Sequence, residues 1–293
     1  MNSLSALFTA YPEAFPWMVG LLGLVIGSFL NVVVHRLPII LEKDWQSQCH
    51  ALLNPDQPPK ASERFNLVIP RSRCPHCGHA ITALENIPVL SFLWLQGKCA
   101  ACRQPISWRY PFVELLTGVL SLLVAWRFGF GMTALAGLLL TWSLIALTFI
   151  DVDRQLLPDN LTLPLLWGGL LFNLSAVYVP LSSAVIGTVA GYVSLWLVYQ
   201  LFKLTTGKEG MGYGDFKLFA ALGAWLGWQS LPLIILLASL VGAVAGISFI
   251  MFFGHDRRMP IPFGPFLCAA GWIALMWGEP LTRLYLQFAR VAV

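Results

Sequence analysis

Residues 132–159 read MTALAGLLLTWSLIALTFIDVDRQLLPD, an apolar run that leads directly into acidic residues. The uncharged part, from Met132 to Ile150, is close to the ~20 residues that a transmembrane helix requires. Asp151 follows it without a spacer. Ionisable groups at membrane depth are costly and tend to be functional. This stretch therefore indicates both the class of fold and a candidate site.

The composition extends this pattern to the whole chain of 293 residues. Hydrophobic residues make up 57% of it and charged residues 11%, against about 25% charged residues in soluble domains. The mean hydropathy is +0.72. These values exclude a disordered chain, a collagen or coiled-coil rod and almost any soluble globular enzyme. They indicate an all-α polytopic membrane protein with lipid as its main partner, and the net charge of +4 gives no reason to expect nucleic acid.

About eight apolar segments have the length and composition of transmembrane helices. Their approximate ranges are 17–34, 112–126, 132–150, 161–179, 183–202, 216–228, 231–253 and 263–277. Two junctions, at 178–181 and 229–230, are so short that the count could change there. No Lys or Arg precedes Arg36, so the first segment lacks the positive start of a secretory signal and is expected to remain as a transmembrane helix.

The positive residues predict how these segments are oriented. Cytoplasmic loops are enriched in Lys and Arg. If the N-terminus is outside, 15 of the 18 Lys and Arg residues lie in inside segments. Those segments are 35–111, 151–159, 203–217 and 254–262. We therefore expect an N-outside topology in which the acidic residues after Ile150 face the cytoplasm.

The segment 35–111 carries two C-x-x-C pairs and is the one sizeable polar part of the chain. The pairs are Cys74 with Cys77 and Cys99 with Cys102, and 21 residues separate them. This spacing is slightly long for a zinc ribbon but fits one. A four-cysteine zinc site is closed to water, so it would be structural rather than catalytic.

Alternatives remain open for the same segment. Four reduced thiols without a metal are one of them, and His76 or His79 as a replacement ligand is another. The segment contains nine prolines, which predict that it forms no long helix. A small domain of this kind usually needs a staple, so we expect zinc to hold it together.

Acidic residues border two spans on the expected cytoplasmic side. Asp151, Asp153 and Asp159 follow the third span, and Asp215 precedes the sixth within Gly212-Tyr213-Gly214-Asp215. Two carboxylates that meet at one membrane face can share a proton and activate water, as in aspartic proteolysis. A proton-coupled transporter that uses the same acids is the competing interpretation. A third is a zinc-ribbon scaffold without catalysis, which leaves the paired acids unexplained.

Other acids have less specific interpretations. Asp153 and Asp159 could be solvated turn or helix-cap residues, or they could attract a basic substrate together with Glu209 through charge complementarity. Glu114 is an isolated carboxylate within the second span. It could pair with a polar group of the bundle or lie in a substrate pocket.

Five blocks of the chain resemble the prepilin peptidase family, the bifunctional leader peptidases and N-methyltransferases of type IV pilus and type II secretion systems. The blocks are GSFLNVVVHRLP (27–38), the two cysteine pairs, PISWRYPFVELLTG (105–118), IDVDRQLLPD (150–159) and GYGDFK (212–217). The resemblance implies cleavage of the basic leader of prepilins and pseudopilins at the cytoplasmic face of the bacterial inner membrane. It also implies methylation of the new N-terminal residue, usually Phe, with S-adenosylmethionine as donor.

The resemblance further implies that Asp151 and Asp215 are the catalytic aspartates and that Gly212 and Gly214 belong to the active-site loop. The expected domains are 1–34 (periplasmic N-terminus and first transmembrane helix), 35–111 (cytoplasmic zinc-binding domain) and 112–293 (seven-helix membrane aspartic peptidase core). No glycine-rich nucleotide fingerprint locates S-adenosylmethionine. The sequence does not give the oligomeric state.

Overall fold

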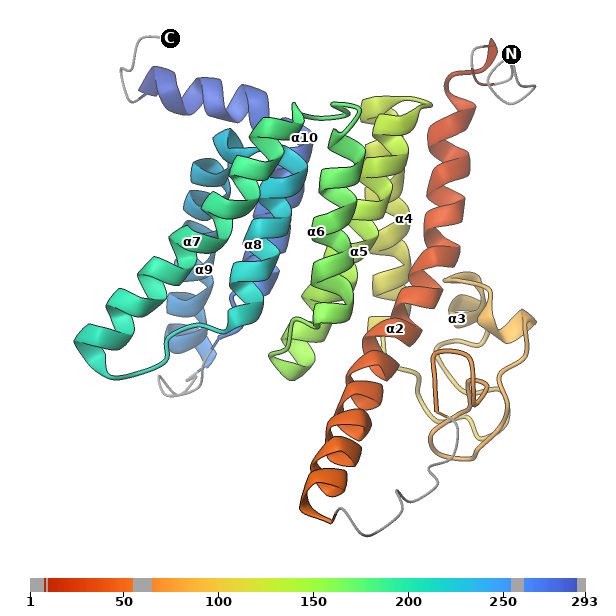
Figure 1. The fold of residues 1–293 in the computed structure, drawn as a ribbon. Helices are drawn as coiled ribbons and strands as arrows, with labels where there is room; N and C mark the ends of the chain where they lie inside the picture. The colour runs from red at the N-terminus through yellow and green to blue at the C-terminus, as the bar shows by residue number, and fades with distance from the viewer. Residues whose placement is uncertain (1–7, 9, 55–64, 254–260, 289–293) are drawn as a thin grey trace. The chain divides into compact units, whose positions relative to one another are not determined.

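The structure, a computed structural model, describes residues 8, 10–54, 65–253 and 261–288 (Figure 1). It divides into two compact units, residues 1–130 and 131–293. Both are helical. The described residues contain no strand, only two isolated bridges in the cysteine loops. The prediction of an all-α chain with a small cysteine-rich region after the first helix is confirmed.

The first unit is built on α2 (Ala14–Leu53) and α4 (Arg109–Phe128), which pack against each other. Glycines allow the close approach. A Cβ on Gly23 would lie 2.7 Å from Ser121 Oγ, and one on Gly27 would lie 2.7 Å from Glu114 Cα. Small residues of this kind let membrane helices pack backbone to backbone. The expected division into residues 1–34, 35–111 and 112–293 stays a prediction; in the first unit, α4 packs along α2.

α2 does not end near Val34 but runs on to Leu53, which gives the whole helix a length of 40 residues. The expectation that 35–111 contains no long helix is therefore wrong for residues 35–53. Pro38 lies inside the helix and is buried. It removes one hydrogen bond, but prolines are tolerated in membrane helices because neighbouring groups satisfy the freed carbonyl.

The second unit places one short helix among longer ones. Its helices are α5 (Met132–Arg154), α6 (Asp159–Asn173), α7 (Leu181–Thr206), α8 (Tyr213–Leu226), η2 (Trp228–Ser230), α9 (Leu231–Phe253) and α10 (Gly264–Phe288). α8 packs against α6, α7 and α10, and nearly every residue from Asp215 to its end is buried. On α7, Gly191 allows α8 to approach, because a Cβ there would lie 2.8 Å from the Phe219 carbonyl oxygen.

Within the described part of the chain, five helices are long and apolar enough to cross a membrane: Ala14–Leu53, Arg109–Phe128, Met132–Arg154, Leu181–Thr206 and Trp228–Ser248. α6 and α8 have 15 and 14 residues and rise only about 22 and 21 Å, which is less than the ~30 Å hydrocarbon core. α10 is kinked at Trp277.

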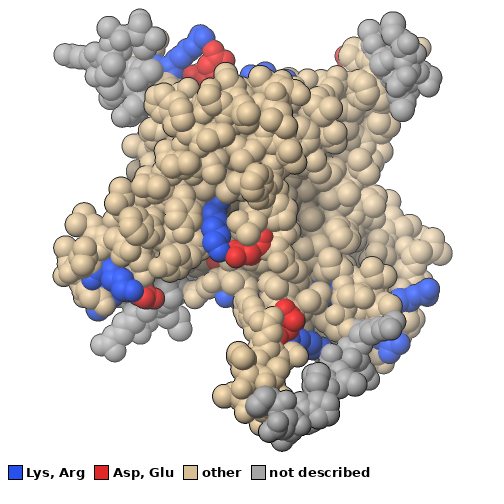
Figure 2. All heavy atoms as spheres, in the orientation of Figure 1, with Lys and Arg blue, Asp and Glu red and all other residues tan. Residues whose placement is uncertain are grey.

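The surface agrees with a multi-pass membrane protein, since Figure 2 shows broad areas without Lys, Arg, Asp or Glu. The count of eight spans and the N-outside orientation stay predictions. Four positive residues used for that orientation, Lys60, Arg64, Arg257 and Arg258, lie outside the described residues.

Candidate functional site

The two aspartates singled out from the sequence lie in one cleft of the second unit. Asp151 is in the last turn of α5 and Asp215 in the first turn of α8. The cleft has a volume of about 390 Å³. Residues 155–157, 209–214 and 261–263 line the rest of it. The two carboxylates are close enough for the charge of Asp151 to act on Asp215.

Local backbone geometry brings each aspartate to the cleft. α5 ends at Gln155, which is left-handed with φ 51° and whose N–H donates to the Asp151 carbonyl oxygen at 2.8 Å. At the start of α8, Gly214 lies against Leu157, because a Cβ on Gly214 would be 2.7 Å from Leu157 Cβ. The glycine of this motif therefore allows the α8 start to pack on the segment that follows Asp151.

The carboxylates have different partners. The Gly264 N–H, at the start of α10, donates to Asp151 Oδ2 at 3.1 Å. Asp215 Oδ1 is buried and has no hydrogen-bond partner among the described residues. The side chains are 5% and 8% exposed for Asp151 and Asp215, so both charges are largely removed from water. Two buried carboxylates in one cleft do not both ionise readily, so one of them favours the protonated form.

The other acids singled out from the sequence differ in whether they line this cleft. Glu209 lines the cleft and forms an ion pair with Lys203 at 2.8 Å. The hydrogen bond from Lys203 and its charge lower the pKa of Glu209. Lys217 Nζ lies 2.7 Å from each carboxylate oxygen of Asp159. Neither Asp159 nor Asp153 is among the residues that line the cleft.

Glu114 belongs to the first unit and not to this cleft. Its Oε2 accepts the Val89 N–H at 2.8 Å, and Ser28 of α2 also hydrogen-bonds to it. Val89 precedes the short helix α3 (Leu90–Trp94) and has a left-handed φ of 61°. Of the two interpretations of Glu114, pairing with a polar group is the one that these contacts fit. The carboxylate fastens the α3 loop to the α2–α4 pair.

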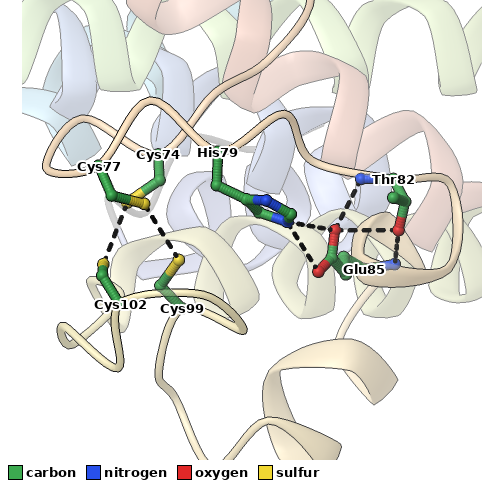
Figure 3. A network of polar contacts seen from close by, with 7 residues as sticks. All are labelled: Cys74, Cys77, His79, Thr82, Glu85, Cys99 and Cys102. Carbon is green, nitrogen blue, oxygen red and sulfur yellow. Dashed lines mark hydrogen bonds and ion pairs between the residues drawn. The ribbon is translucent and has the colours of Figure 1, made fainter.

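The four cysteines of the two pairs converge in the first unit, as Figure 3 shows. Their sulfur atoms all lie within 4.8 Å of one another, with 3.8 Å between Cys74 and Cys102 and 4.0 Å between Cys77 and Cys99. A tetrahedral zinc with Zn–S bonds of about 2.3 Å needs sulfurs about 3.8 Å apart. The separations of 3.8 and 4.0 Å are close to this value, so the cluster could hold zinc.

The two cysteine pairs are formed by two similar turns. In the first, Cys74 N–H donates to the His79 carbonyl and Gly78 N–H to the Cys74 carbonyl. In the second, Cys99 and Arg103 make the corresponding bonds, to Gln104 and Cys99. The fifth residue of each turn is left-handed, with φ 71° at Gly78 and 59° at Arg103. The repeated turn explains why C-x-x-C spacing aims two sulfurs at one point.

The electrostatics of the cluster favour a cation. Hydrogen bonds from the Cys77 and His76 backbone lower the pKa of the Cys74 thiol to about 6. The Gln104 backbone lowers the pKa of Cys102, but burial and the neighbouring sulfurs outweigh it and raise that pKa to about 12. Thiolates this close repel one another, and a divalent cation removes the repulsion.

His79 points away from the cysteines (Figure 3). Its Nε2 lies 3.1 Å from Glu85 Oε1, and Thr82 donates to the same carboxylate from its N–H and hydroxyl. Glu85 belongs to the short helix η1 (Leu84–Asn86). His79 thus has its own partner outside the sulfur cluster.

Three site residues escaped the sequence analysis: Gly264, Lys203 and Lys217. A Gly-Pro pair at 264–265 is a signal for a helix start after a turn. It does not reveal that the Gly264 amide meets a carboxylate from α5. In the sequence, the two lysines are simply two of the positive residues in segments expected to face the cytoplasm. Only the fold identifies their acidic partners.

Comparison with known proteins adds independent findings. Residues 21–128 match the family described as the bacterial peptidase A24 N-terminal domain, and residues 138–247 match the type IV leader peptidase family. The chain is 62% identical over 277 residues to a protein of Aeromonas salmonicida (strain A449), covering 93% of this chain and 95% of that one. It is 60% identical over 285 residues to one of Aeromonas hydrophila, covering 96% and 98%.

A protein of Pseudomonas aeruginosa is 56% identical over 280 residues, with 96% of each chain covered. All three relatives bear the name prepilin leader peptidase/N-methyltransferase. No solved structure matches the chain.

Proposed function

Because the chain belongs to the type IV leader peptidase family, we propose that it is a membrane aspartic endopeptidase and N-methyltransferase. It removes the basic leader from type IV prepilins and type II secretion pseudopilins and then methylates the new N-terminal residue. The observation that carries the peptidase half is the cleft that holds both Asp151 and Asp215.

The proposed cleavage needs one ionised and one protonated carboxyl group. The ionised group takes a proton from a water molecule as the water oxygen attacks the scissile carbonyl carbon. The protonated group donates its proton to the carbonyl oxygen, which gives a neutral diol. Collapse of the diol breaks the C–N bond, and the leaving nitrogen receives a proton from the pair. Leader carboxylate and mature amine are released, and the pair returns to its starting protonation.

The short α8 suits a substrate that lies partly in the membrane. A helix of 14 residues does not reach across the bilayer core, so one of its ends lies within membrane depth. Irregular backbone is tolerated there only beside protein or a water-filled cavity. The loop 209–214 is irregular backbone of this kind, and it lines the cleft. We propose that the cleft opens to the cytoplasm at the inner membrane, where a basic leader is retained.

We propose zinc as the resident metal of the four-cysteine cluster, with Cys74, Cys77, Cys99 and Cys102 as ligands. Its role is structural, since four thiolates complete the tetrahedron and leave no place for water. S-adenosylmethionine supplies the methyl group for the second activity. The attacking atom is the amine nitrogen that cleavage has released, so cleavage must come first.

Glu209 is the acid best placed to meet the basic leader, because it lines the cleft. A leader Lys or Arg would replace Lys203 as its partner. Asp153, Asp159 and Glu114 were expected to share this role. Glu209 lines the cleft and these three residues do not, so Glu209 is the one best placed to contact the leader.

The peptidase proposal is tested with purified protein and a synthetic prepilin, followed by mass spectrometry. Asp151→Asn and Asp215→Asn should each slow cleavage about a thousandfold or more, because each removes a group that moves a proton. Wild type should release a mature peptide that gains one methyl group when S-adenosylmethionine is present. Unchanged cleavage in both folded variants would contradict the aspartic mechanism and favour the transporter alternative, which a flux assay would then examine.

A further inference from the structure

We infer that the two aspartates have fixed and different roles, and that the backbone amide of Gly264 sets the difference. Asp151 is the ionised base that takes the proton from water. Asp215 is the protonated acid that donates to the scissile carbonyl oxygen. This inference rests on the proposed peptidase function and adds Gly264 to it as a positioning residue.

One contact of Asp151 favours its charged form, although burial disfavours charge on both carboxyl groups. Its Oδ2 accepts the Gly264 N–H at 3.1 Å. Gly264 is the first residue of α10, a helix of 25 residues. A hydrogen bond donated to a carboxylate favours its ionised form.

The surroundings of Asp215 favour its protonated form. The Gly212 backbone hydrogen-bonds its carboxyl group, but Oδ1 is buried without a partner among the described residues. A buried charged oxygen that lacks a donor is costly. The negative charge of Asp151 nearby adds to that cost. A proton on Asp215 removes both costs and makes the group a hydrogen-bond donor.

Only glycine fits at position 264. A Cβ there would lie 2.5 Å from Asp151 Oδ2 and 3.2 Å from both Asp151 Cγ and Leu157 Cδ1. Any other residue would push the carboxylate away from the amide that holds it. Because Gly264 has no side chain, the Asp151 carboxylate can lie within hydrogen-bond distance of the Gly264 amide.

Two further groups bear on how Asp151 titrates. Asp215 approaches from α8, and Cys268 approaches from α10, where its buried thiol hydrogen-bonds to Thr148. A thiol on this apolar helix face is neutral near pH 7 and does not compete with Asp215 for the role of acid. The Gly264 contact to Asp151 and the buried Oδ1 of Asp215, which lacks a partner in the described part of the chain, therefore separate the two carboxyl groups.

With these roles the proton transfers can be assigned to atoms. Asp151 takes a proton from the attacking water, and the Asp215 proton passes to the carbonyl oxygen to form the diol. When the diol collapses, Asp151 gives its proton to the leaving nitrogen. A diol hydroxyl returns its proton to Asp215 as the carbonyl re-forms. No oxidant or metal enters the balance.

The test compares Gly264→Ala with Gly271→Ala as a matched control. Gly271 is also on α10, and a Cβ there would lie 2.5 Å from a carbon of Leu222 instead of a carboxylate. We expect Gly264→Ala to lower kcat about 100-fold with little change in KM. The pH at which kcat falls on the acidic side should also rise by about one unit, because Asp151 loses a hydrogen bond that favours its ionised form. Gly271→Ala should keep the wild-type pH profile even if it melts at a lower temperature.

A second comparison does not depend on Gly264→Ala being folded. The Asn amide in Asp215→Asn still donates a hydrogen bond to the carbonyl oxygen, whereas Asp151→Asn leaves no carboxylate at the position that the Gly264 amide holds. Residual cleavage should therefore be higher in Asp215→Asn. A wild-type pH profile in folded Gly264→Ala, or the reverse order of the two Asn variants, would overturn the inference. Cleavage at the wild-type rate in both Asn variants would overturn the proposed function instead.

Discussion

The cysteine cluster of the first unit and the aspartate pair of the second are both small sets of reactive side chains, but the chain assembles them differently. The cysteines lie within residues 74–102 and come from two similar turns. The aspartates come from α5 and α8, with two helices between them in the chain. The first site depends on local turns and, in our proposal, on a metal, whereas the second depends on how long helices pack.

The two sites also differ in how the charges of their side chains are balanced. Four sulfurs within 4.8 Å of one another could together hold a cation, which we propose is zinc. For the two carboxylates we propose that one is protonated and one ionised, because their surroundings are unequal. Each of the changes below should damage one site and spare the other.

Removing the metal should have the largest effect on the first unit. Cys74→Ser combined with Cys77→Ser takes away two ligands, so bound zinc should be lost completely. Loop 65–108 should then become sensitive to protease, while the prepilin is still cleaved. Metal analysis, limited proteolysis and the cleavage assay measure the three effects. Full zinc content in the double variant would show that the cluster is not the zinc site.

Crowding the helix contacts should have an intermediate effect. In the first unit, Gly27→Val places carbon against the Glu114 backbone, which cannot move aside. A cost of about 1–3 kcal/mol is typical of overpacking. Gly191→Val should cost a similar amount at the α7–α8 contact and should also slow cleavage, because α8 carries Asp215.

The control for these variants is Gly20→Ala, whose nearest neighbour would be a Leu122 side-chain carbon at 3.3 Å. It should unfold close to the wild-type temperature in detergent. Equal loss of cleavage in Gly27→Val and Gly191→Val would contradict the assignment of catalysis to the second unit.

Neutralising one acid of the cleft should have the smallest effect. Glu209→Gln should raise KM for a basic leader about threefold at low salt and leave kcat unchanged, because exposed ion pairs contribute little. Asp159→Asn removes the same charge from a residue outside the cleft lining, so its KM should stay at the wild-type value. A similar KM in both variants would mean that net charge alone attracts the leader.

Some of this arrangement is readable from the sequence because it is local. C-x-x-C spacing identifies the cysteine turns, and long apolar runs identify the helices. The carboxylate after Ile150 is visible as a feature of the membrane edge. Helix ends are less predictable. α2 passes through Pro38 because the proline is buried in a packed helix, which the residue type alone does not reveal.

Long-range pairings could not be predicted. The Lys217–Asp159 and Lys203–Glu209 ion pairs depend on how helices and loops lie beside one another. The Gly264 amide reaches Asp151 from across the second unit. Such contacts are set by tertiary packing, so no local pattern encodes them.

We propose that cleavage depends on the aspartate pair and that methylation also needs the cysteine-rich segment to be folded, and one crossed measurement tests this directly. Cleavage of an intact prepilin and methylation of an already mature peptide are measured for Asp151→Asn and for the Cys74→Ser/Cys77→Ser variant. We predict that the aspartate variant methylates the mature peptide but does not cleave. The cysteine variant should cleave but methylate poorly. Loss of both activities in each folded variant would contradict the division of function between the two units.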